Sequence, residues 1–247
     1  MKPKFPEAQE SMMILLDGVQ LTLASEAGAV NVLRGVSLKI AKGETVALVG
    51  PSGSGKSTLM MVIGGLERAN AGSVVIAGRD FAGLGEDDLA RLRRENIGIV
   101  FQSFHLMPAM TALENVALPL ELAGRDDAAA AARATLAAVG LSARERHYPA
   151  QLSGGEQQRV AIARAFVASP GLILADEPTG NLDGETGRKV MDLLFGLAAE
   201  SGTTLLLITH DRALARRCSR ILSLEDGRIT ADEKSATGAA RRGRKRR

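Results

Sequence analysis

Residues 50–57 read Gly-Pro-Ser-Gly-Ser-Gly-Lys-Ser and match the pattern G-x-x-x-x-G-K-[ST]. They follow the apolar run Thr45–Val49 and precede the helix-like segment Thr58–Leu66, which is the strand, loop and helix context that this pattern needs. Glycines let backbone N–H groups turn inward around an anion, and the helix start adds positive charge. The pattern predicts a nucleoside triphosphate site with Mg²⁺ on the Ser57 hydroxyl. The residues expected to hold the nucleotide are Gly50, Pro51, Ser52, Gly53, Ser54, Gly55, Lys56, Ser57 and Thr58.

Two acidic residues and one histidine follow other apolar runs. Asp176 and Glu177 come directly after Leu172–Ala175, and His210 follows Thr204–Thr209. A carboxylate at the end of a buried parallel strand can hold Mg²⁺ beside the phosphates, so Asp176 is a predicted metal ligand. We expect Glu177 to orient or deprotonate the attacking water, with His210 as a further catalytic residue at a strand end. The guanine-reading pattern N-K-x-D is absent, which disfavours a GTPase.

A second glycine pair stands at the start of another helix-like segment. Leu152-Ser-Gly-Gly-Glu-Gln157 precedes residues 158–169, so Ser153, Gly154 and Gly155 offer backbone N–H groups at a helix start. One triphosphate has a single γ-phosphate end, whereas this chain has two segments that could bind phosphate. The economical arrangement is two chains packed head to tail, in which each chain closes the nucleotide of the other.

With these motifs in place, the chain resembles the ATP-binding subunits of ABC transporters from about Ile14 to Ile229. FQSFHLMP, TALENVALPL, LSGGEQQRVAIARAF and ADEPTGNLD are particularly similar to the lipoprotein-releasing and macrolide-exporting branch. The resemblance implies a homodimer that hydrolyses ATP with Mg²⁺ and drives a separate membrane permease at the inner face of the cell membrane. The transported substrate would be hydrophobic or lipid-linked. It further implies site roles for Gln102 (catalytic and metal-binding), for Ser153, Gly154, Gly155 and Glu156, and for Asp183.

One position departs from the family pattern. Family members usually carry an aromatic ring, on which adenine stacks, at the position that aligns near Leu23. No Phe, Tyr or Trp occurs between Phe5 and Phe81. Losing a ring that contributes about 1 to 3 kcal/mol by stacking should weaken base selectivity and leave the phosphate grip intact. We expect ATP and GTP to bind with affinities within about tenfold of each other.

The elements that must position these residues form a strand and helix alternation, which predicts a mainly parallel sheet. The predicted fold is α/β, a P-loop NTPase core with N-terminal antiparallel strands and an inserted helical subdomain. The expected divisions are a flexible N-terminus (1–10), the ATP-binding core (11–102 and 169–231), the helical subdomain with the second glycine pair (103–168) and a disordered basic tail (232–247). The predicted strands are Met13–Leu16, Val36–Ile40, Thr45–Val49, Ser73–Ile76, Ile97–Phe101, Leu172–Ala175, Thr204–Ile208 and Ile221–Leu224. The predicted helices of the insertion are Ala112–Leu122, Ala128–Val139 and Glu156–Val167.

Composition excludes several protein classes. The chain has 247 residues, 45% hydrophobic and 24% charged, which is ordinary globular composition. Cys218 is the lone cysteine, and no apolar run reaches the roughly 20 residues that span a bilayer. The first residues lack the apolar core of a secretory signal, so a cytoplasmic location is expected. Six basic residues within 241–247 outweigh the net charge of +3, and removing them leaves −3, so the body is mildly acidic.

Two interpretations stay open at this stage. Residues 103–108, which follow Gln102, either form part of the groove for a cytoplasmic helix of the permease or only fill the local core. A soluble ABC ATPase acting on nucleic acid or ribosomes is the alternative function, and the basic tail is the feature that supports it. Such proteins typically carry two cassettes or a long coiled-coil insertion, and this chain has one cassette without sustained heptads. Nucleic acid is therefore the less favoured partner.

Overall fold

The computed structural model describes residues 11–25 and 28–235. The predicted flexible N-terminus and residues 236–247 of the predicted tail lie outside this range. The chain divides into two compact units, Met1–Arg91 with Thr204–Arg247, and Leu92–Thr203. Within the described residues, no helix combines the length and the apolar character needed to cross a membrane.

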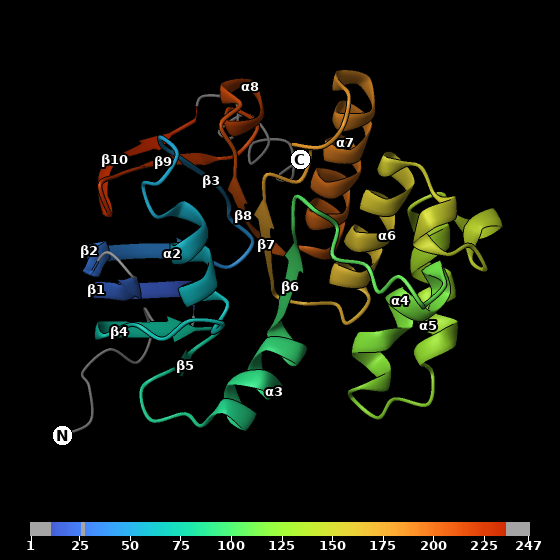
Figure 1. The fold of residues 1–247 in the computed structure, drawn as a ribbon, viewed down its shortest axis with the longest axis horizontal. Helices are drawn as coiled ribbons and strands as arrows, with labels where there is room; N and C mark the ends of the chain where they lie inside the picture. The colour runs from blue at the N-terminus through green and yellow to red at the C-terminus, as the bar shows by residue number, and fades with distance from the viewer. Residues whose placement is uncertain (1–10, 26–27, 236–247) are drawn as a thin grey trace, which may run out of the picture. The chain divides into compact units, whose positions relative to one another are not determined.

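An antiparallel sheet opens the first unit. Buried side chains such as Ile14, Leu16, Leu38 and Ile40 recur at every second position, which is the period that places them on one face of the sheet. Helix α2 (Lys56–Ile63) packs against strands β2 (Gly28–Ala41) and β4 (Ala71–Ile76) of this sheet (Figure 1). The predicted N-terminal antiparallel strands are therefore present. In sheet order the strands are β2 (Gly28–Ala41), β1 (Met12–Ser25), β4 (Ala71–Ile76) and β5 (Arg79–Asp80).

The first unit also contains four strands of a largely parallel sheet. β3 pairs in parallel with both β8 and β9, and β10 is antiparallel to β9. β8 is buried along its whole length and β3 at its centre, as expected for parallel strands that helices cover. In sheet order the strands are β10 (Arg228–Lys234), β9 (Arg220–Glu225), β3 (Thr45–Val49) and β8 (Thr204–Ile208). The helices are α2 (Lys56–Ile63), α8 (Arg212–Ala215) and the start of α3 (Glu86–Asn96).

The predicted start of the disordered tail at residue 232 is wrong. Asp232, Glu233 and Lys234 complete β10 and pair with β9. The Arg220 guanidinium donates to both carboxylate oxygens of Asp232 at 2.6 Å, which lowers the pKa of that carboxyl. β10 is a polar strand that its neighbour and this ion pair hold in place. An apolar pattern in the sequence therefore cannot reveal it.

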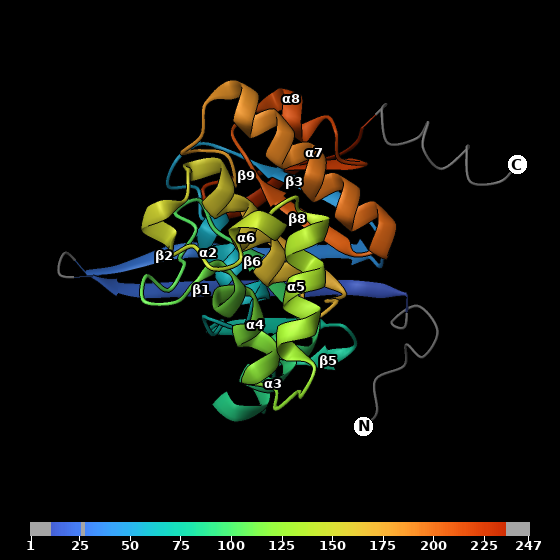
Figure 2. The same ribbon diagram turned by 90° about the vertical axis from the view of Figure 1, so that its right-hand side faces the viewer.

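The second unit combines two parallel strands with a helical cluster. β6 pairs in parallel with β7. Residues 103–168, all of them described, contain only helices and loops. Helices α4, α5 and α6 lie side by side (Figure 2). They bury a shared apolar cluster that includes Val116, Leu136 and Val160. The division of the chain into a core and a helical subdomain at residues 103–168 stays a prediction. The elements are β6 (Ile97–Val100), α4 (Ala112–Glu121), α5 (Ala128–Ala138), the short 3₁₀ helices η1 (Ser142–Arg144) and η2 (Pro149–Gln151), α6 (Gly154–Phe166), β7 (Leu172–Asp176) and α7 (Gly184–Ser201).

Side-chain caps fix where the helices of the second unit begin. Thr111 and Glu114 form a reciprocal capping box at the start of α4, in which each side chain accepts the backbone N–H of the other residue. Ser153 and Glu156 do the same for α6. Asp183 caps the start of α7, and Gly202, in the left-handed region with a φ of 66°, caps its end.

Candidate functional site

The loop between β3 and α2 has the shape that its glycines predict. Gly50, Gly53 and Gly55 have φ values of 154°, 78° and 100°. A Cβ on Gly50 would lie 2.0 Å from the carbonyl oxygen of Leu224, and one on Gly55 would lie 3.0 Å from that of Val32. Other residue types would therefore not fit at these two positions. The first turn of α2 carries no acidic side chain, so its positive end is available to an anion.

The predicted nucleotide-binding residues of this loop fall into two groups. Lys56 Nζ donates to the carbonyl oxygens of Gly50 at 3.0 Å and Pro51 at 2.7 Å, so its ammonium group lies over the loop. Ser54 is buried, and its carbonyl oxygen accepts the N–H of Gly227 in the turn between β9 and β10. Gly55 is buried as well, and the accessible side of the loop is formed by other predicted residues. Pro51, Ser52, Gly53 and Ser57 are exposed, and Thr58 is half-buried.

Leu23 lies near the end of the β1–β2 hairpin, where it pairs with Val30. The two side chains are 37% and 51% exposed, so an aliphatic surface occupies the position where the sequence predicts base contact. Val32, two residues further along β2, contacts the loop between β3 and α2 at Gly55, since its carbonyl oxygen and a side-chain methyl bound the space for a Cβ there. The hairpin end therefore adjoins the loop.

His210 follows β8 in the same unit, directly after the buried Thr209. Its side chain is exposed, as a residue that meets a substrate must be. The next residue, Asp211, accepts the N–H of Ala213 and so caps α8. The structure thus places His210 after a strand end, as predicted, and shows that a helix start follows it.

In the second unit, Asp176 ends β7 and Glu177 follows it in an unusual backbone conformation. Glu177 has a φ of 44°, a region that costs a non-glycine residue about 1 to 3 kcal/mol and is concentrated at functional sites. Its carbonyl oxygen accepts the N–H of Gly180, which closes a turn. Both acidic residues are half-buried. The strain is consistent with the catalytic role predicted for Glu177.

Gln102 is tied to the segment that follows β7. Asn181 Nδ2 donates to the Gln102 carbonyl oxygen at 3.0 Å, and Gln102 Nε2 donates to Asn181 Oδ1 at 3.4 Å. A Cβ on Gly180 would lie 2.5 Å from Gln102 Nε2. The structure thus brings together a predicted catalytic residue and a segment 79 positions away in the sequence. Sequence reasoning assigned no such contact to Asn181.

Ser153, Gly154, Gly155 and Glu156 form the start of α6. Ser153 Oγ accepts the N–H of Glu156 at 3.3 Å, and Glu156 Oε2 accepts the N–H of Ser153 at 2.9 Å. A Cβ on Gly155 would lie 2.4 Å from the Thr186 side chain in α7. Asp183, which the resemblance assigns to nucleotide binding, uses its carboxylate to cap α7, and hydrogen bonds from the α7 backbone lower its pKa.

The loop that follows Gln102 is held in a strained shape. Phe104 and His105 have φ values of 59° and 49°. Their carbonyl oxygens accept hydrogen bonds from Arg164 at 2.9 and 2.7 Å, and burial lowers the pKa of that guanidinium. The fully buried Asn115 fixes Met107, whose N–H it accepts at 2.7 Å. Leu106 packs against the helical cluster, whereas Met107 is 46% exposed. Leu106 therefore packs on the edge of the core and Met107 lies on the surface, and binding of a permease helix by this loop stays a prediction.

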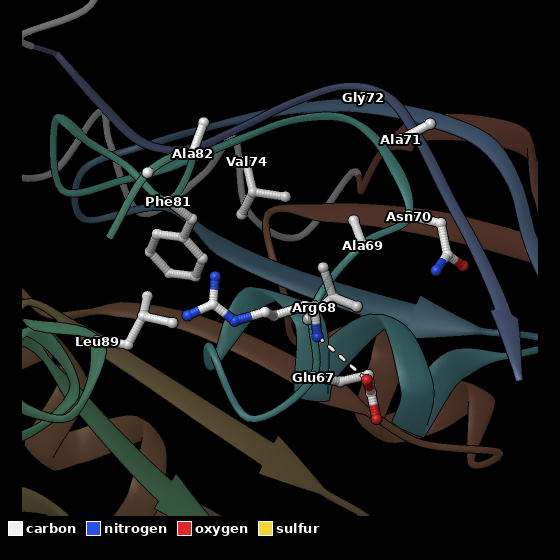
Figure 3. Close-up of a pocket in the computed structure, with 12 residues that line it drawn as sticks. Glu67, Arg68, Ala69, Asn70, Ala71, Gly72, Val74, Phe81, Ala82 and Leu89 are labelled. Carbon is white, nitrogen blue, oxygen red and sulfur yellow. Dashed lines mark hydrogen bonds between the residues drawn. The ribbon is translucent and has the colours of Figure 1, made fainter. Parts of the chain in front are cut away.

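A hollow in the first unit contains none of the predicted site residues. Its apolar lining comes from Val62, Val74, Phe81 and Leu89. Figure 3 shows the Arg68 guanidinium between Phe81 and Leu89. The Arg68 guanidinium donates to Glu86 Oε1 and to the Leu84 carbonyl oxygen, both at 2.9 Å. Its charge is therefore already paired.

Comparisons with known proteins agree with the motifs. The family model described as ABC transporter matches residues 33–180. The lipoprotein-releasing system ATP-binding protein LolD of Geobacter metallireducens is 52% identical over 225 residues, which cover 90% of this chain and 100% of that protein. The uncharacterised ABC transporter ATP-binding protein YbbA of Escherichia coli K12 is 52% identical over 201 residues, which cover 81% of this chain and 88% of that protein.

Solved structures support the same conclusion. The dimeric cassette MJ0796 in a post-hydrolysis state bound to ADP and Pi has a TM-score of 0.83 and 43% identity, and covers 90% of this chain and 98% of that chain. A second dimeric structure of MJ0796, a bacterial ABC transporter cassette, has the same TM-score and coverage at 44% identity. The predicted fold class and ATPase activity are confirmed. The chain belongs to the ABC transporter family and is one of its ATP-binding subunits.

Proposed function

We propose that two copies of this chain associate head to tail around two ATP molecules with Mg²⁺ and that their hydrolysis cycle drives a separate membrane permease. The chain would act at the cytoplasmic face of the cell membrane, held there by the permease. Extraction or export of a lipid-linked or otherwise hydrophobic substrate is the transport task that we infer. The name of the Geobacter metallireducens relative, a lipoprotein-releasing ATPase, supports that substrate class.

The residue roles follow from the chemistry of phosphoryl transfer. Enzymes accelerate this reaction mainly by positioning the reacting groups and by neutralising their charge. Lys56 and the N–H groups of the loop after β3 would hold the phosphates, and Glu177 would accept a proton from the attacking water. His210 and Gln102 would orient the water and the γ-phosphate. Leu23 would contact the base.

Oxygen donors are available for the metal. Mg²⁺ prefers hydroxyl, amide and carboxylate oxygens, which Ser57, Gln102 and Asp176 supply. The hydrogen bond from Gln102 Nε2 to Asn181 directs the amide nitrogen toward the segment after β7, so the amide oxygen is the end that would bind a metal. When bound, Mg²⁺ would neutralise charge on the β- and γ-phosphates.

One observation carries the proposal. The chain has two glycine-lined helix starts, one before α2 and one before α6. A Cβ on Gly55 in the first, or on Gly155 in the second, would lie within 3.0 Å of a neighbouring group. Backbone N–H groups at each helix start can bind an anion. Head-to-tail association uses both helix starts on a single triphosphate. The dimeric state of MJ0796, with ADP and Pi bound, supports this arrangement.

The test is the Glu177→Gln variant, which keeps the shape of the side chain and removes the proton acceptor. We expect phosphate release to fall at least about 100-fold, the low end of what general base catalysis supplies. ATP and Mg²⁺ should then convert the variant to a dimer in analytical ultracentrifugation. Glu200→Gln, an exposed site on α7, is the matched control and should behave as the parent does. A Glu177→Gln protein that stays monomeric at high concentration contradicts the proposal.

Membrane fractionation tests the partner. Cells that express the tagged chain are lysed and separated in mild salt. Recovery with an integral membrane protein that detergent solubilises together with the chain supports the transporter. RNase-sensitive recovery with ribosomes would instead support the soluble nucleic-acid ATPase.

A further inference from the structure

Glu156 places a fixed negative charge at the start of α6. Its Oε2 accepts the Ser153 N–H at 2.9 Å, and its Oε1 accepts a hydrogen bond from Arg144 Nε at 2.8 Å. Only 18% of the Glu156 side chain is exposed. The Arg144 hydrogen bond and then that of Ser153 lower the pKa of Glu156 to about 2. The carboxylate is therefore ionised throughout the physiological pH range.

This charge conflicts with the role of the helix start in the proposed function. The N-terminal N–H groups of α6 attract anions, and the proposed dimer requires them to receive the triphosphate end bound by the partner subunit. A carboxylate in the first turn repels that triphosphate. A glutamine at the same position could accept the same Ser153 N–H through its amide oxygen without carrying charge. A compensating cation is therefore needed beside Glu156.

Arg144 meets this need by its position in the fold. It ends η1 and contacts α6 across the 12 positions that separate it from Glu156. Its side chain is 43% exposed, so part of the guanidinium faces solvent beside the helix start. The adjacent acidic residue, Glu145, is held by Arg133 at 2.9 Å. Arg144 thus pairs with Glu156, whereas Glu145 pairs with Arg133.

We propose that Arg144 is a positioning residue that neutralises Glu156, so that the start of α6 can accept the terminal phosphate held by a second copy of this chain. This role rests on the head-to-tail dimer of the proposed function. Arg144 acts through Glu156 and through the local potential and is not assigned a contact with the reacting atoms. Its loss should weaken ATP-dependent association more than it changes the folded monomer.

The test measures the dissociation constant of the ATP·Mg²⁺ dimer in the Glu177→Gln background by analytical ultracentrifugation. A charge near a helix terminus changes binding by roughly threefold per site, and a dimer contains two such sites, so Arg144→Met should weaken the dimer about tenfold. Arg144→Lys keeps the charge and should restore most of the affinity. Raising the salt concentration should shrink the difference, because salt screens exposed charges. Arg133→Met, which removes the neighbouring ion pair, is the matched control and should leave the dimer within about twofold of the parent.

A double-mutant cycle separates charge compensation from a structural role. In the Glu156→Gln background, Arg144→Met should change the dissociation constant by less than about twofold, because no carboxylate is left to neutralise. An equal loss in both backgrounds, or no loss in either, overturns the proposal and leaves the dimer itself established. A Glu177→Gln parent that never dimerises overturns both this proposal and the proposed function. Urea midpoints of the monomers identify any variant that simply fails to fold.

Discussion

Replacing Leu23 by tyrosine should convert the aliphatic end of the β1–β2 hairpin into a stacking surface. Leu23 and its partner Val30 are both exposed there, and Val32 of the same hairpin bounds the phosphate loop at Gly55. A ring at position 23 would therefore extend the surface that adjoins the phosphate site. Strand geometry tolerates tyrosine well.

The expected gain follows from the difference between an aliphatic and an aromatic contact. Stacking a base on an aromatic side chain is worth about 1 to 3 kcal/mol. Leu23 and Val30 already offer apolar contact, so the net gain should lie at the lower end, about 1 to 1.5 kcal/mol, which is roughly 5- to 12-fold in affinity. Every purine has a π-face, so ATP and GTP should both gain and their ratio should stay within about tenfold.

Competition titrations with ATP, GTP and inorganic tripolyphosphate provide the assay. Leu23→Tyr should raise the affinity for both nucleotides and leave tripolyphosphate unchanged, because the latter has no base. Ala24→Tyr is the matched control, since successive strand residues face opposite sides of the hairpin. A strong ATP preference in the parent protein, or an equal gain for tripolyphosphate, would refute the assignment of Leu23 to the base.

Four further variants test other parts of the structure. Gly98→Ala should lower the free energy of unfolding in urea by about 3 kcal/mol or more, because its Cβ would lie 2.2 Å from the Ala165 carbonyl oxygen. Gly196→Ala, at a position in α7 with open space around it, should raise that free energy by about 0.5 to 1 kcal/mol. The lowered pKa of Glu156 stabilises the fold above the usual glutamate pKa of 4.5, and this contribution is lost as pH falls toward 2. Between pH 7 and pH 3 the free energy of unfolding of Glu156→Gln should therefore fall by about 1 kcal/mol less than that of the parent, after allowance for solvent screening at the 43% exposed Arg144 side chain. Asn181→Ala should lower the ATPase turnover number roughly 2- to 12-fold, the value of one to two hydrogen bonds, and should leave the urea midpoint nearly unchanged because the residue is exposed.

The sequence predicts best those elements that local residue types determine. The apolar runs Thr45–Val49 and Thr204–Ile208 form β3 and β8 with the predicted bounds. Parallel strands that are buried on both faces are continuous apolar segments, so the sequence of each strand identifies it without knowledge of its neighbours. α6 begins at Gly154, two residues before the predicted helix, because Ser153 and Glu156 form the capping box that an apolar period does not show. Loop glycines such as Gly50 predict their own backbone shape in the same way.

Elements that depend on partners escape sequence reasoning. The outer half of the β1–β2 hairpin carries polar, exposed residues such as Thr22 and Asn31, which resemble a loop until the two strands pair. α3 is similarly polar, with charged residues at seven of its eleven positions. The contact of Asn181 with Gln102 joins residues 79 positions apart, and only the fold brings such residues together.

In the second unit, residues 177–186 contact both Gln102 and the start of α6. Gln102 packs against Gly180 and Asn181, and Gly155 leaves only 2.4 Å between its missing Cβ and Thr186. Closely packed groups transmit displacement because no free volume absorbs it. A shift of residues 177–186, which begin at the strained Glu177, must therefore be accommodated both at Gln102 and at the start of α6. In the proposed dimer that helix start would serve the nucleotide of the partner, so a shift at one Glu177 would reach the other nucleotide through contacts within a single unit.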